Sequence, residues 1–558
     1  MDHFTPNPAN SSPLTPLTFL ERAAIAYADS ISIRYNRTSF TWSQTHRRCL
    51  QLASSLSSLA LGTRHVISVL SPNTPQTYEL HFAVPMSGAI LNNLNTRLDH
   101  NTLSVLLRHS ESKLVFVHRH SLSLLLRAIS TFPPNTPRPF LVLITDDTLA
   151  AHPNILDTYD GLLSKGDPGF QWVRPNSEWD PITLNYTSGT TSSPKGVVHS
   201  HRSTFLMTLA SLVDWSMPKQ PIYLWTLPMF HSNGWTFPWG IAAVGGINVC
   251  ARKINAPTVY RLIESHRVTH MCAAPVVLNM LVTFPKPLNH VVHVLTGGSS
   301  PPATILTRAE ELGFVVSHGY GMTETCGVMV SCAWRREWNR FPATERARLK
   351  ARQGVMTVAM TEVDVVEPES GNSVKRDGLT IGEIVVRGAC VMLGYLKDES
   401  ATWQCVKKNG WFYTGDMGVI HEDGYLEIKD RSKDVIISGG ENLSSVEVEA
   451  VLYTHPAVTE AAVVARPDYY WGETPCAFVR LKEGLERRPS EKEVVEYCRE
   501  RLPHFMVPKT VVFKEDLPKT STGKILKHVL RMDAKAMGSL ATPLLLPTHP
   551  HAVLISRM

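Results

Sequence analysis

The sequence predicts an α/β protein with a large N-terminal domain of stacked mixed sheets, helices and a small β subdomain, followed by a small mobile α+β C-terminal domain. Three observations support this fold class. Short β-branched runs recur over the first 300 residues, closely spaced strands follow after about residue 362, and a separate helix and strand pattern begins near residue 430. At 558 residues the chain is also too long for one compact core.

The N-terminal runs are short, and most lie far enough apart to leave room for a helix between them. Buried strands of parallel or mixed sheets have this composition. The clearest runs are residues 66–70, 114–117, 140–144 and 291–295.

The later runs are joined by turns, which favours an antiparallel sheet; they are residues 363–366, 382–386 and 425–428. A charged segment at 430–434 marks a boundary. We therefore expect an N-terminal domain at 1–430 with a β subdomain at about 362–430, a C-terminal domain at 431–540, and a tail at 541–558.

Two capping boxes indicate helices in the C-terminal domain. Ser444 with Glu447 predicts a helix that runs toward His455, and Ser490 with Glu493 predicts one that stops before Pro503. Strands are expected between these helices, at residues 461–464 and 477–480.

The composition is that of a globular protein, with 43% hydrophobic and 19% charged residues. The 55 basic and 49 acidic residues are spread along the chain, so the weak excess argues against nucleic acid as the main partner. No stretch approaches the roughly 18 apolar residues of a membrane span, and no secretory signal begins the chain. The nine cysteines lack metal-ligand spacing, which favours free thiols in a reducing compartment.

The segment 186–196 concentrates hydroxyls, two glycines and a lysine in one loop, between a strand and a second strand or a helix. Backbone N–H groups, hydroxyls and the charge of Lys195 suit a polyphosphate. The loop is not a Walker sequence, because Gly196 follows the lysine rather than preceding it. An ordinary surface turn is the alternative interpretation.

Four further segments appear in order along the chain: 227–231, 318–324, 410–416 and 519–524. Together with the loop they resemble the acyl-adenylate-forming superfamily, which includes acyl-CoA synthetases, 4-coumarate-CoA ligases, peptide-synthetase adenylation domains and firefly luciferase. The resemblance covers about residues 20–535 and is greatest to plant acyl-activating enzymes for benzoate, cinnamate and short acyl acids. One departure is Ser192, where members commonly carry glycine.

The resemblance implies a reaction in two halves, with ATP, Mg²⁺ and CoA. A carboxylate attacks the α-phosphorus of ATP and expels pyrophosphate; a thiol then attacks the acyl-adenylate. The implied catalytic residues are Lys524, His231, Thr190 and Glu324, and Glu324 and Thr190 are the implied Mg²⁺ ligands. The implied nucleotide and CoA positions are Thr187, Ser188, Gly189, Thr190, Thr191, Lys195, Ser299, Ser300, Gly319, Tyr320, Gly321, Thr323, Asp416, Arg431, Lys433, Gly439, Gly440 and Lys524.

By the same resemblance, Tyr320 offers a flat surface to adenine and Asp416 accepts the ribose hydroxyls. Lys524 reaches the acyl carboxylate and the α-phosphate, and His231 lies at the entrance to the binding site of the carboxylic acid substrate. Taken singly, each of these residues has a structural alternative: a core tyrosine, a turn aspartate, a solvated lysine and a structural histidine.

The second half-reaction is implied to follow a rotation of the C-terminal domain about Lys433, which brings Gly439 and Gly440 toward the pantetheine; an ordinary hairpin is the alternative for these glycines. Trp235 and Trp239 favour a short or flat acid if they face its pocket. The arginine-rich stretch 335–352 is either a solvated helix face or a site near the CoA phosphates.

The chain ends Ser556, Arg557, Met558, a small-basic-apolar tripeptide of the type that a peroxisomal import receptor reads. This predicts a peroxisomal protein, with the cytosol as the alternative.

The leading hypothesis is a carboxylic acid:CoA ligase for aryl or short- to medium-chain acids, without an integral membrane segment or a nucleic acid partner. The alternatives are a luciferase-like adenylate-forming oxidase and a non-catalytic sensor of nucleotides or acyl-adenylates. A carrier-protein loading enzyme is disfavoured, because too few residues follow residue 540 for a carrier domain.

Overall fold

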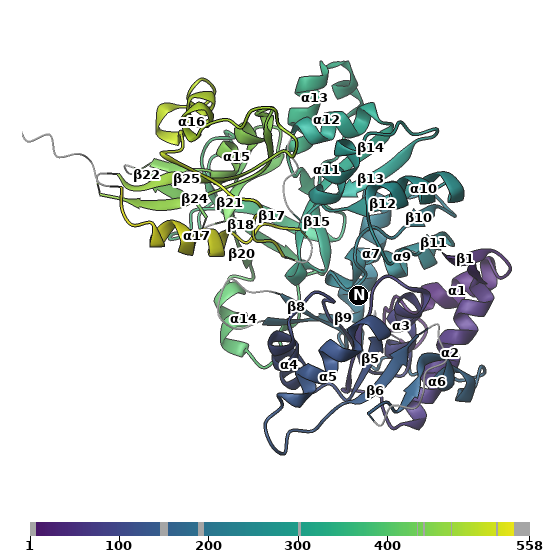
Figure 1. The fold of residues 1–558 in the computed structure, drawn as a ribbon. Coiled ribbons are helices and arrows are strands. Elements are labelled where there is room, and N and C mark those ends of the chain that lie inside the picture. Colours follow the sequence, from purple (N-terminus) through teal and green to yellow (C-terminus); the bar gives the residue numbers. More distant parts are fainter. Residues whose placement is uncertain are drawn as a thin grey trace, which may run out of the picture. The chain divides into compact units, whose positions relative to one another are not determined.

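The computed structural model describes residues 7–145, 154–187, 195–298, 303–431, 434–438, 441–469, 471–520 and 523–540 (Figure 1). The chain divides into two compact units. The large unit combines Met1–Ile428 with Lys519–Lys524, and the small unit combines Lys429–Pro518 with Ile525–Met558. Within the described ranges, no helix has both the length and the apolar character needed to cross a bilayer.

The first sheet of the large unit has eight strands in the order β19-β9-β8-β4-β3-β5-β6-β7. Their bounds are β3 Val66–Leu70, β4 Ile90–Asn93, β5 Leu114–His118, β6 Phe140–Ile144, β7 Asp157–Thr158, β8 Pro181–Thr187, β9 Lys195–Ser200 and β19 Gly394–Tyr395. Strands β3 to β8 pair in parallel, whereas β9 pairs antiparallel with β8 and β19 pairs antiparallel with β9. Three of the predicted runs are therefore strands β3, β5 and β6.

Alternate residues of these strands pack on opposite layers of helices, because side chains along a strand point to opposite faces. Phe116 and Val142 belong to a core cluster with helices α2, α3 and α6, whereas Val115 and Leu143 belong to another with helices α4 and α5. The helices are α2 Trp42–Ser58, α3 Pro75–Met86, α4 His100–His109, α5 Leu122–Ser130 and α6 Tyr159–Lys165. Coverage on both faces explains why the runs are continuously apolar.

The second sheet has nine strands in the order β16-β15-β14-β13-β12-β10-β11-β1-β2. Their bounds are β1 Ile31–Tyr35, β2 Thr38–Thr41, β10 Ile222–Leu224, β11 Ile247–Val249, β12 His270–Ala273, β13 Val292–Thr296, β14 Phe314–Met322, β15 Gly327–Ser331 and β16 Val355–Met356. The strands from β14 through β13, β12, β10 and β11 to β1 pair in parallel, and the outer pairs are antiparallel. The predicted run 291–295 is strand β13, displaced by one residue.

One apolar cluster joins both sheets into a single core. It contains Phe116 of the first sheet together with Tyr223, Cys272 and Leu295 of the second. The opposite face of the second sheet is covered by α10 Ala256–His266, α11 Pro275–Thr283 and α12 Ala303–Glu311. The other helices of the large unit are α1 Thr18–Ala26, α7 His201–Asp214, α8 Ser232–Trp235, α9 Phe237–Val244, α13 Ala343–Ala351 and α14 Glu399–Cys405.

A third, four-stranded sheet has the order β17-β18-β20-β21. Its strands are β17 Met360–Val366, β18 Gly382–Gly388, β20 Phe412–Ile420 and β21 Leu426–Arg431. The pairs β17–β18 and β18–β20 are antiparallel, so this sheet is the small β subdomain that the sequence predicts.

The small unit is an α+β fold with the strand order β23-β22-β25-β24, to which β26 adds beside β25. Its elements are β22 Ile436–Ser438, β23 Glu441–Leu443, α15 Ser445–Thr454, β24 Val458–Asp468, β25 Gly472–Leu481, α16 Glu491–Arg499, β26 Thr510–Phe513 and α17 Lys527–Ala536. The strands predicted at 461–464 and 477–480 are β24 and β25.

One of the two predicted capping boxes is complete. At α16, Ser490 and Glu493 bond each other's backbone N–H groups. At α15, the Ser444 hydroxyl accepts the Glu447 N–H at 3.3 Å, but the Glu447 carboxylate pairs with Lys429 at 3.0 Å. The reciprocal half of that box was therefore a wrong prediction, because a nearby cation attracts the carboxylate more strongly than a backbone amide does.

Candidate active site

The predicted phosphate loop connects two antiparallel strands. Thr187, at the end of β8, pairs with Lys195, at the start of β9. Of the two connections that the sequence allowed, the structure has strand-loop-strand. The loop positions Ser188, Gly189, Thr190 and Thr191 lie outside the described residues, so their roles stay predictions.

A tyrosine joins the cation of this loop to the predicted Mg²⁺ ligand. The Lys195 Nζ lies 4.6 Å from the centroid of the Tyr395 ring, and the Tyr395 hydroxyl donates to the Glu324 Oε1 at 2.9 Å. Glu324 is 7% exposed and lies in the short 3₁₀ helix Thr323–Thr325, directly after β14. The fold thus brings Lys195 and Glu324 to one place through a residue that none of the five sequence segments contains.

The hydroxyl of partly buried Tyr395 is strongly perturbed. Burial, and then the negative charge of Glu324, raise the pKa of Tyr395 well above its ordinary value. The hydroxyl therefore remains protonated at neutral pH and acts as a donor to the carboxylate.

The segment that carries Glu324 needs glycine at two positions. A Cβ on Gly321 would lie 1.8 Å from the Gly327 carbonyl oxygen, and one on Gly319 would lie 2.5 Å from the Val328 Cγ1. The β14–β15 ladder shifts register between Tyr320 and Gly321. This close approach of two backbones explains the glycines without reference to a ligand, while it also sets the direction of Tyr320.

Tyr320 and Asp416, which are predicted to bind adenosine, are in contact although they are 96 positions apart in the sequence. The Tyr320 hydroxyl donates to the Asp416 Oδ2 at 2.6 Å, and both side chains are more than nine-tenths buried. Asp416 lies in β20, where its N–H donates to the Thr414 hydroxyl at 3.1 Å. A carboxylate offers about four lone-pair sites, so Asp416 can hold the tyrosine and still accept hydroxyl donors.

His231 precedes a strained turn. The five residues from 232 to 236 all have left-handed φ, at 36°, 40°, 53°, 50° and 71°, although only Gly234 is a glycine. The Asn233 Oδ1 accepts the Asn185 Nδ2 of β8, which ties this turn to the strand that leads into the phosphate loop. Strain of this kind persists only where the surroundings enforce it, and it is frequent in functional sites.

The His231 imidazole is neutral in this setting. Burial, and then the positive charge of Lys524, lower the pKa of His231 to about 4. Lys524 belongs to Lys519–Lys524, which groups with the large unit, and a Cβ on the neighbouring Gly523 would lie 2.5 Å from the Val276 Cγ1. The structure therefore brings Lys524 within electrostatic range of His231.

The two tryptophans after His231 have different positions. The ring of Trp235 lies 3.3 Å from where a Cβ of Gly297 would be, beside the segment that leads to Ser299 and Ser300. Trp239 is fully buried, and its Nε1 donates to the His81 carbonyl oxygen at 3.3 Å. Of the two tryptophans, Trp235 is therefore the one that lies beside Gly297.

Other predicted positions lie outside the described residues. They are Ser299, Ser300, Lys433, Gly439 and Gly440, together with the side chain of Arg431 and the C-terminal Ser556, Arg557 and Met558. The strands that flank Gly439 and Gly440 pair as a hairpin, with Ser438 opposite Glu441. The hairpin alternative thus fits the flanking strands, and the pantetheine role stays a prediction.

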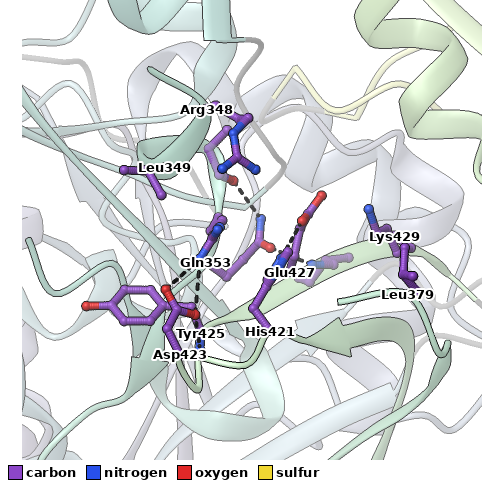
Figure 2. A network of polar contacts seen from close by, with 12 residues as sticks. Arg348, Leu349, Gln353, Leu379, His421, Asp423, Tyr425, Glu427 and Lys429 are labelled. Carbon is purple, nitrogen blue, oxygen red and sulfur yellow. Dashed lines mark hydrogen bonds and ion pairs between the residues drawn. The ribbon is translucent and has the colours of Figure 1, made fainter. Parts of the chain in front are cut away.

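The arginine-rich stretch is engaged in structural contacts. Arg348 pairs with Glu345 at 2.7 Å, and Arg352 pairs with Asp423 at 2.9 Å. Figure 2 shows Asp423 in a polar network with Tyr425 and Gln353, and the Gln353 Oε1 accepts the Ile428 N–H. These contacts favour a structural role for the stretch over a phosphate site.

The residues at Glu324 fit a magnesium ion that arrives with a nucleotide. Mg²⁺ prefers oxygen ligands and is usually held by one or two carboxylates plus substrate phosphates. Glu324 supplies a buried carboxylate whose orientation the Tyr395 hydroxyl fixes. Within the described ranges, no group of three or more His, Cys, Asp or Glu side chains could hold a metal ion.

Two buried histidines near Glu324 lead us to expect that the folded protein loses stability in acid. The His199 Nε2 contacts the Thr323 carbonyl oxygen at 2.6 Å and the His318 Nδ1 contacts that of Arg352 at 3.2 Å. Burial lowers the pKa of each to about 4. Because the unfolded chain takes up these protons near pH 6.5, stability falls as the pH drops from about 6.5 to about 4, by up to roughly 1.4 kcal/mol per pH unit for each histidine.

We expect the thermal unfolding midpoint to fall between pH 7 and pH 5, and to fall less in His318→Asn, which lacks one titrating ring. Scanning calorimetry of both proteins at pH 7, 6 and 5 checks this. An equal fall in both would show that His318 is not held neutral by the fold.

Comparison with known proteins places the chain among nucleotide-dependent enzymes. The family model described as AMP-binding enzyme matches residues 20–396, and the AMP-binding enzyme C-terminal domain matches residues 447–524. The 2-methylpropanoate–CoA ligase CCL4 of Humulus lupulus is 63% identical, with 97% of this chain and 98% of the relative covered. The probable acyl-activating enzyme 5, peroxisomal, of Arabidopsis thaliana is also 63% identical, with 97% and 99% covered.

A solved structure has the same fold. The o-succinylbenzoate CoA synthetase of Bacillus subtilis, in complex with its acyl-adenylate intermediate, superposes with a TM-score of 0.78 at 26% identity, covering 92% of this chain and 97% of that one. The family models, the relatives and the convergence of the predicted segments agree, and the chain belongs to the AMP-binding enzyme family.

Proposed function

We propose that the protein is an ATP-dependent carboxylic acid:CoA ligase that forms an acyl-CoA through an acyl-adenylate. The observation that carries the proposal is that Lys195, Tyr395 and Glu324 lie together at the start of β9. Strands β8 and β9, with the phosphate loop between them, are called the phosphate-loop hairpin below. A cation and an oriented carboxylate beside such a loop suit a polyphosphate with its metal ion. The names of the close relatives, CoA ligases and acyl-activating enzymes, support the same activity.

In the first half-reaction, the acid oxygen bonds to the α-phosphorus of ATP and the bond to pyrophosphate breaks. Lys195 stabilises the negative charge that accumulates on the phosphates, and Lys524 stabilises that on the carboxylate and α-phosphate. Mg²⁺, held by Glu324 and Thr190, would neutralise phosphate charge. Asp416 and Tyr320 orient the adenosine, so that the reacting atoms are held in line.

In the second half-reaction, the CoA thiol loses its proton to solvent and its sulfur bonds to the acyl carbon, while the bond from that carbon to the phosphate oxygen breaks and AMP leaves. We propose that residues 1–430 and 431–540 are the two domains, that the second turns about Lys433, and that Gly439 and Gly440 then line the path of the thiol. A neutral His231 at the entrance to the binding site of the carboxylic acid can accept a hydrogen bond without repelling Lys524.

A short branched acid is the substrate class that we propose first. The relative from Humulus lupulus carries 2-methylpropanoate in its name at 63% identity, and Trp235 fills space beside Gly297. Aryl acids of the benzoate type remain in the proposed range, since a flat ring also fits beside an indole.

The proposed location is the peroxisome. The tripeptide Ser556, Arg557, Met558 supports it, as does a relative named peroxisomal. Loss of punctate localisation of a fluorescent fusion on removal of these three residues would test it; retention would favour another signal.

Thioester formation tests the proposed activity. With ATP, Mg²⁺ and CoA, we expect 2-methylpropanoate to yield its CoA thioester and AMP in equal amounts, with lower rates for butyrate, hexanoate, benzoate and cinnamate. AMP release without thioester from all five acids would contradict the ligase assignment. A thioester from benzoate but not from 2-methylpropanoate would contradict the substrate class alone.

A further inference from the structure

Tyr395 is held rigidly at the edge of the first sheet. Its backbone pairs with Val197 of β9, its N–H donates to the Thr402 hydroxyl at 2.9 Å, and the next N–H, of Leu396, donates to the Gly196 carbonyl oxygen at 2.7 Å. Two residues on, the Lys397 Nζ donates to the His109 carbonyl oxygen at 2.9 Å. These bonds fix the tyrosine relative to the phosphate-loop hairpin before any substrate binds.

The side chain of Tyr395 contacts two opposite charges with two different parts. The ring face receives the Lys195 ammonium, and the hydroxyl donates to the Glu324 carboxylate. A tyrosine that contacts both groups can hold the ammonium with its ring and the carboxylate with its hydroxyl, so that it sets the direction of each.

On the basis of the proposed function, we propose that Tyr395 is a positioning residue that orients Glu324 toward Mg²⁺ and Lys195 toward the phosphates of ATP. Partners that hydrogen-bond a metal-ligating carboxylate set its direction, and their loss commonly lowers metal affinity about 10- to 100-fold. The ring contributes separately, because a cation over an aromatic face is attracted without a hydrogen bond.

Two substitutions separate the two contacts. Tyr395→Phe removes the hydroxyl and keeps the ring, so the contact with Lys195 persists while Glu324 loses its donor. Tyr395→Leu removes both. Tyr260→Phe is the control, because it removes a tyrosine hydroxyl elsewhere in the large unit, which donates to the Leu281 carbonyl oxygen at 3.0 Å.

The measurement is ATP binding by calorimetry, without acid or CoA, over a titration of Mg²⁺ that includes a metal-free sample. Mg²⁺ should raise ATP affinity, and the Mg²⁺ concentration that gives half of this increase is the quantity compared. For Tyr395→Phe we expect this concentration to be roughly tenfold higher than for the wild type. Metal-free ATP affinity should be unchanged. For Tyr395→Leu, metal-free ATP affinity should also fall, by about threefold.

The control should match the wild type at every Mg²⁺ concentration, and thermal unfolding should confirm that all variants are folded. Unchanged Mg²⁺ dependence in Tyr395→Phe would overturn the inference while leaving the ligase proposal intact. If the wild type itself binds no ATP, the proposed function fails and the inference fails with it.

Discussion

Lys524→Ala is expected to slow acyl-adenylate formation by roughly 10²- to 10³-fold, the usual loss when one preorganised group that stabilises developing charge is removed. Its segment, Lys519–Lys524, groups with the large unit, and the charge of Lys524 reaches His231. CoA transfer to a supplied acyl-adenylate should fall less than about threefold, because the proposed turn of the C-terminal domain about Lys433 takes Lys524 away from the acyl-adenylate before the thiol attacks. Single-turnover assays of the two half-reactions measure each rate.

Lys509→Ala is the control for this variant. Lys509 is an exposed lysine of the small unit, whose Nζ lies 5.9 Å from the Trp471 ring, so its loss removes the same charge without touching the site. Both half-reactions should be unaffected. Equal losses in the two half-reactions of Lys524→Ala would contradict a role confined to adenylation.

Asp416→Ala is expected to raise the KM for ATP roughly 100-fold. A hydrogen bond to a charged group contributes about 1.5–3 kcal/mol, and two ribose hydroxyls would lose this acceptor. The substitution also leaves the buried Tyr320 hydroxyl without the partner that it has at 2.6 Å. Steady-state kinetics with varied ATP give the change.

A comparison of ATP with 2′-deoxy-ATP distinguishes ribose binding by Asp416 from a general loss of structure in the variant. Wild-type enzyme should prefer ATP over 2′-deoxy-ATP by about tenfold, and Asp416→Ala should show little preference. Asp377→Ala, at an exposed turn of the same β subdomain, should keep the wild-type preference. An undiminished preference in Asp416→Ala would place the ribose elsewhere.

Much of the fold could be predicted from local sequence patterns. Continuous apolar runs such as 66–70 and 140–144 are strands with those same bounds, because helices cover both faces of the sheet. Ser490 and Glu493 form the predicted capping box for the same local reason. In contrast, Glu447 pairs with Lys429, a contact that depends on tertiary structure and that a four-residue pattern does not contain.

The candidate site shows the same division between local and distant information. The segments with Lys195, Tyr320, Glu324 and Asp416 could be recognised because each has a distinctive local sequence, and the fold brings Tyr320 to Asp416. Tyr395 could not be recognised, because its importance arises from the pairing of β19 with β9. Nothing in its neighbours indicates a site.

The left-handed turn from 232 to 236 was also not predictable. Only Asn233 and Gly234 among these residues adopt positive φ readily, so the preferences of the other three argue against the turn. Packing enforces it: a Cβ on Gly234 would lie 2.7 Å from the Trp225 ring, and Asn233 is bonded to Asn185. Such conflicts between local preference and structure are expected at functional sites.

The central claim is that the protein joins an acid to the α-phosphate of ATP before CoA takes part. Exchange of labelled pyrophosphate into ATP, measured with 2-methylpropanoate and Mg²⁺ in the absence of CoA, tests this most directly. The account predicts exchange that requires the acid and is lost in Lys524→Ala. Thioester formation without such exchange would contradict an acyl-adenylate intermediate.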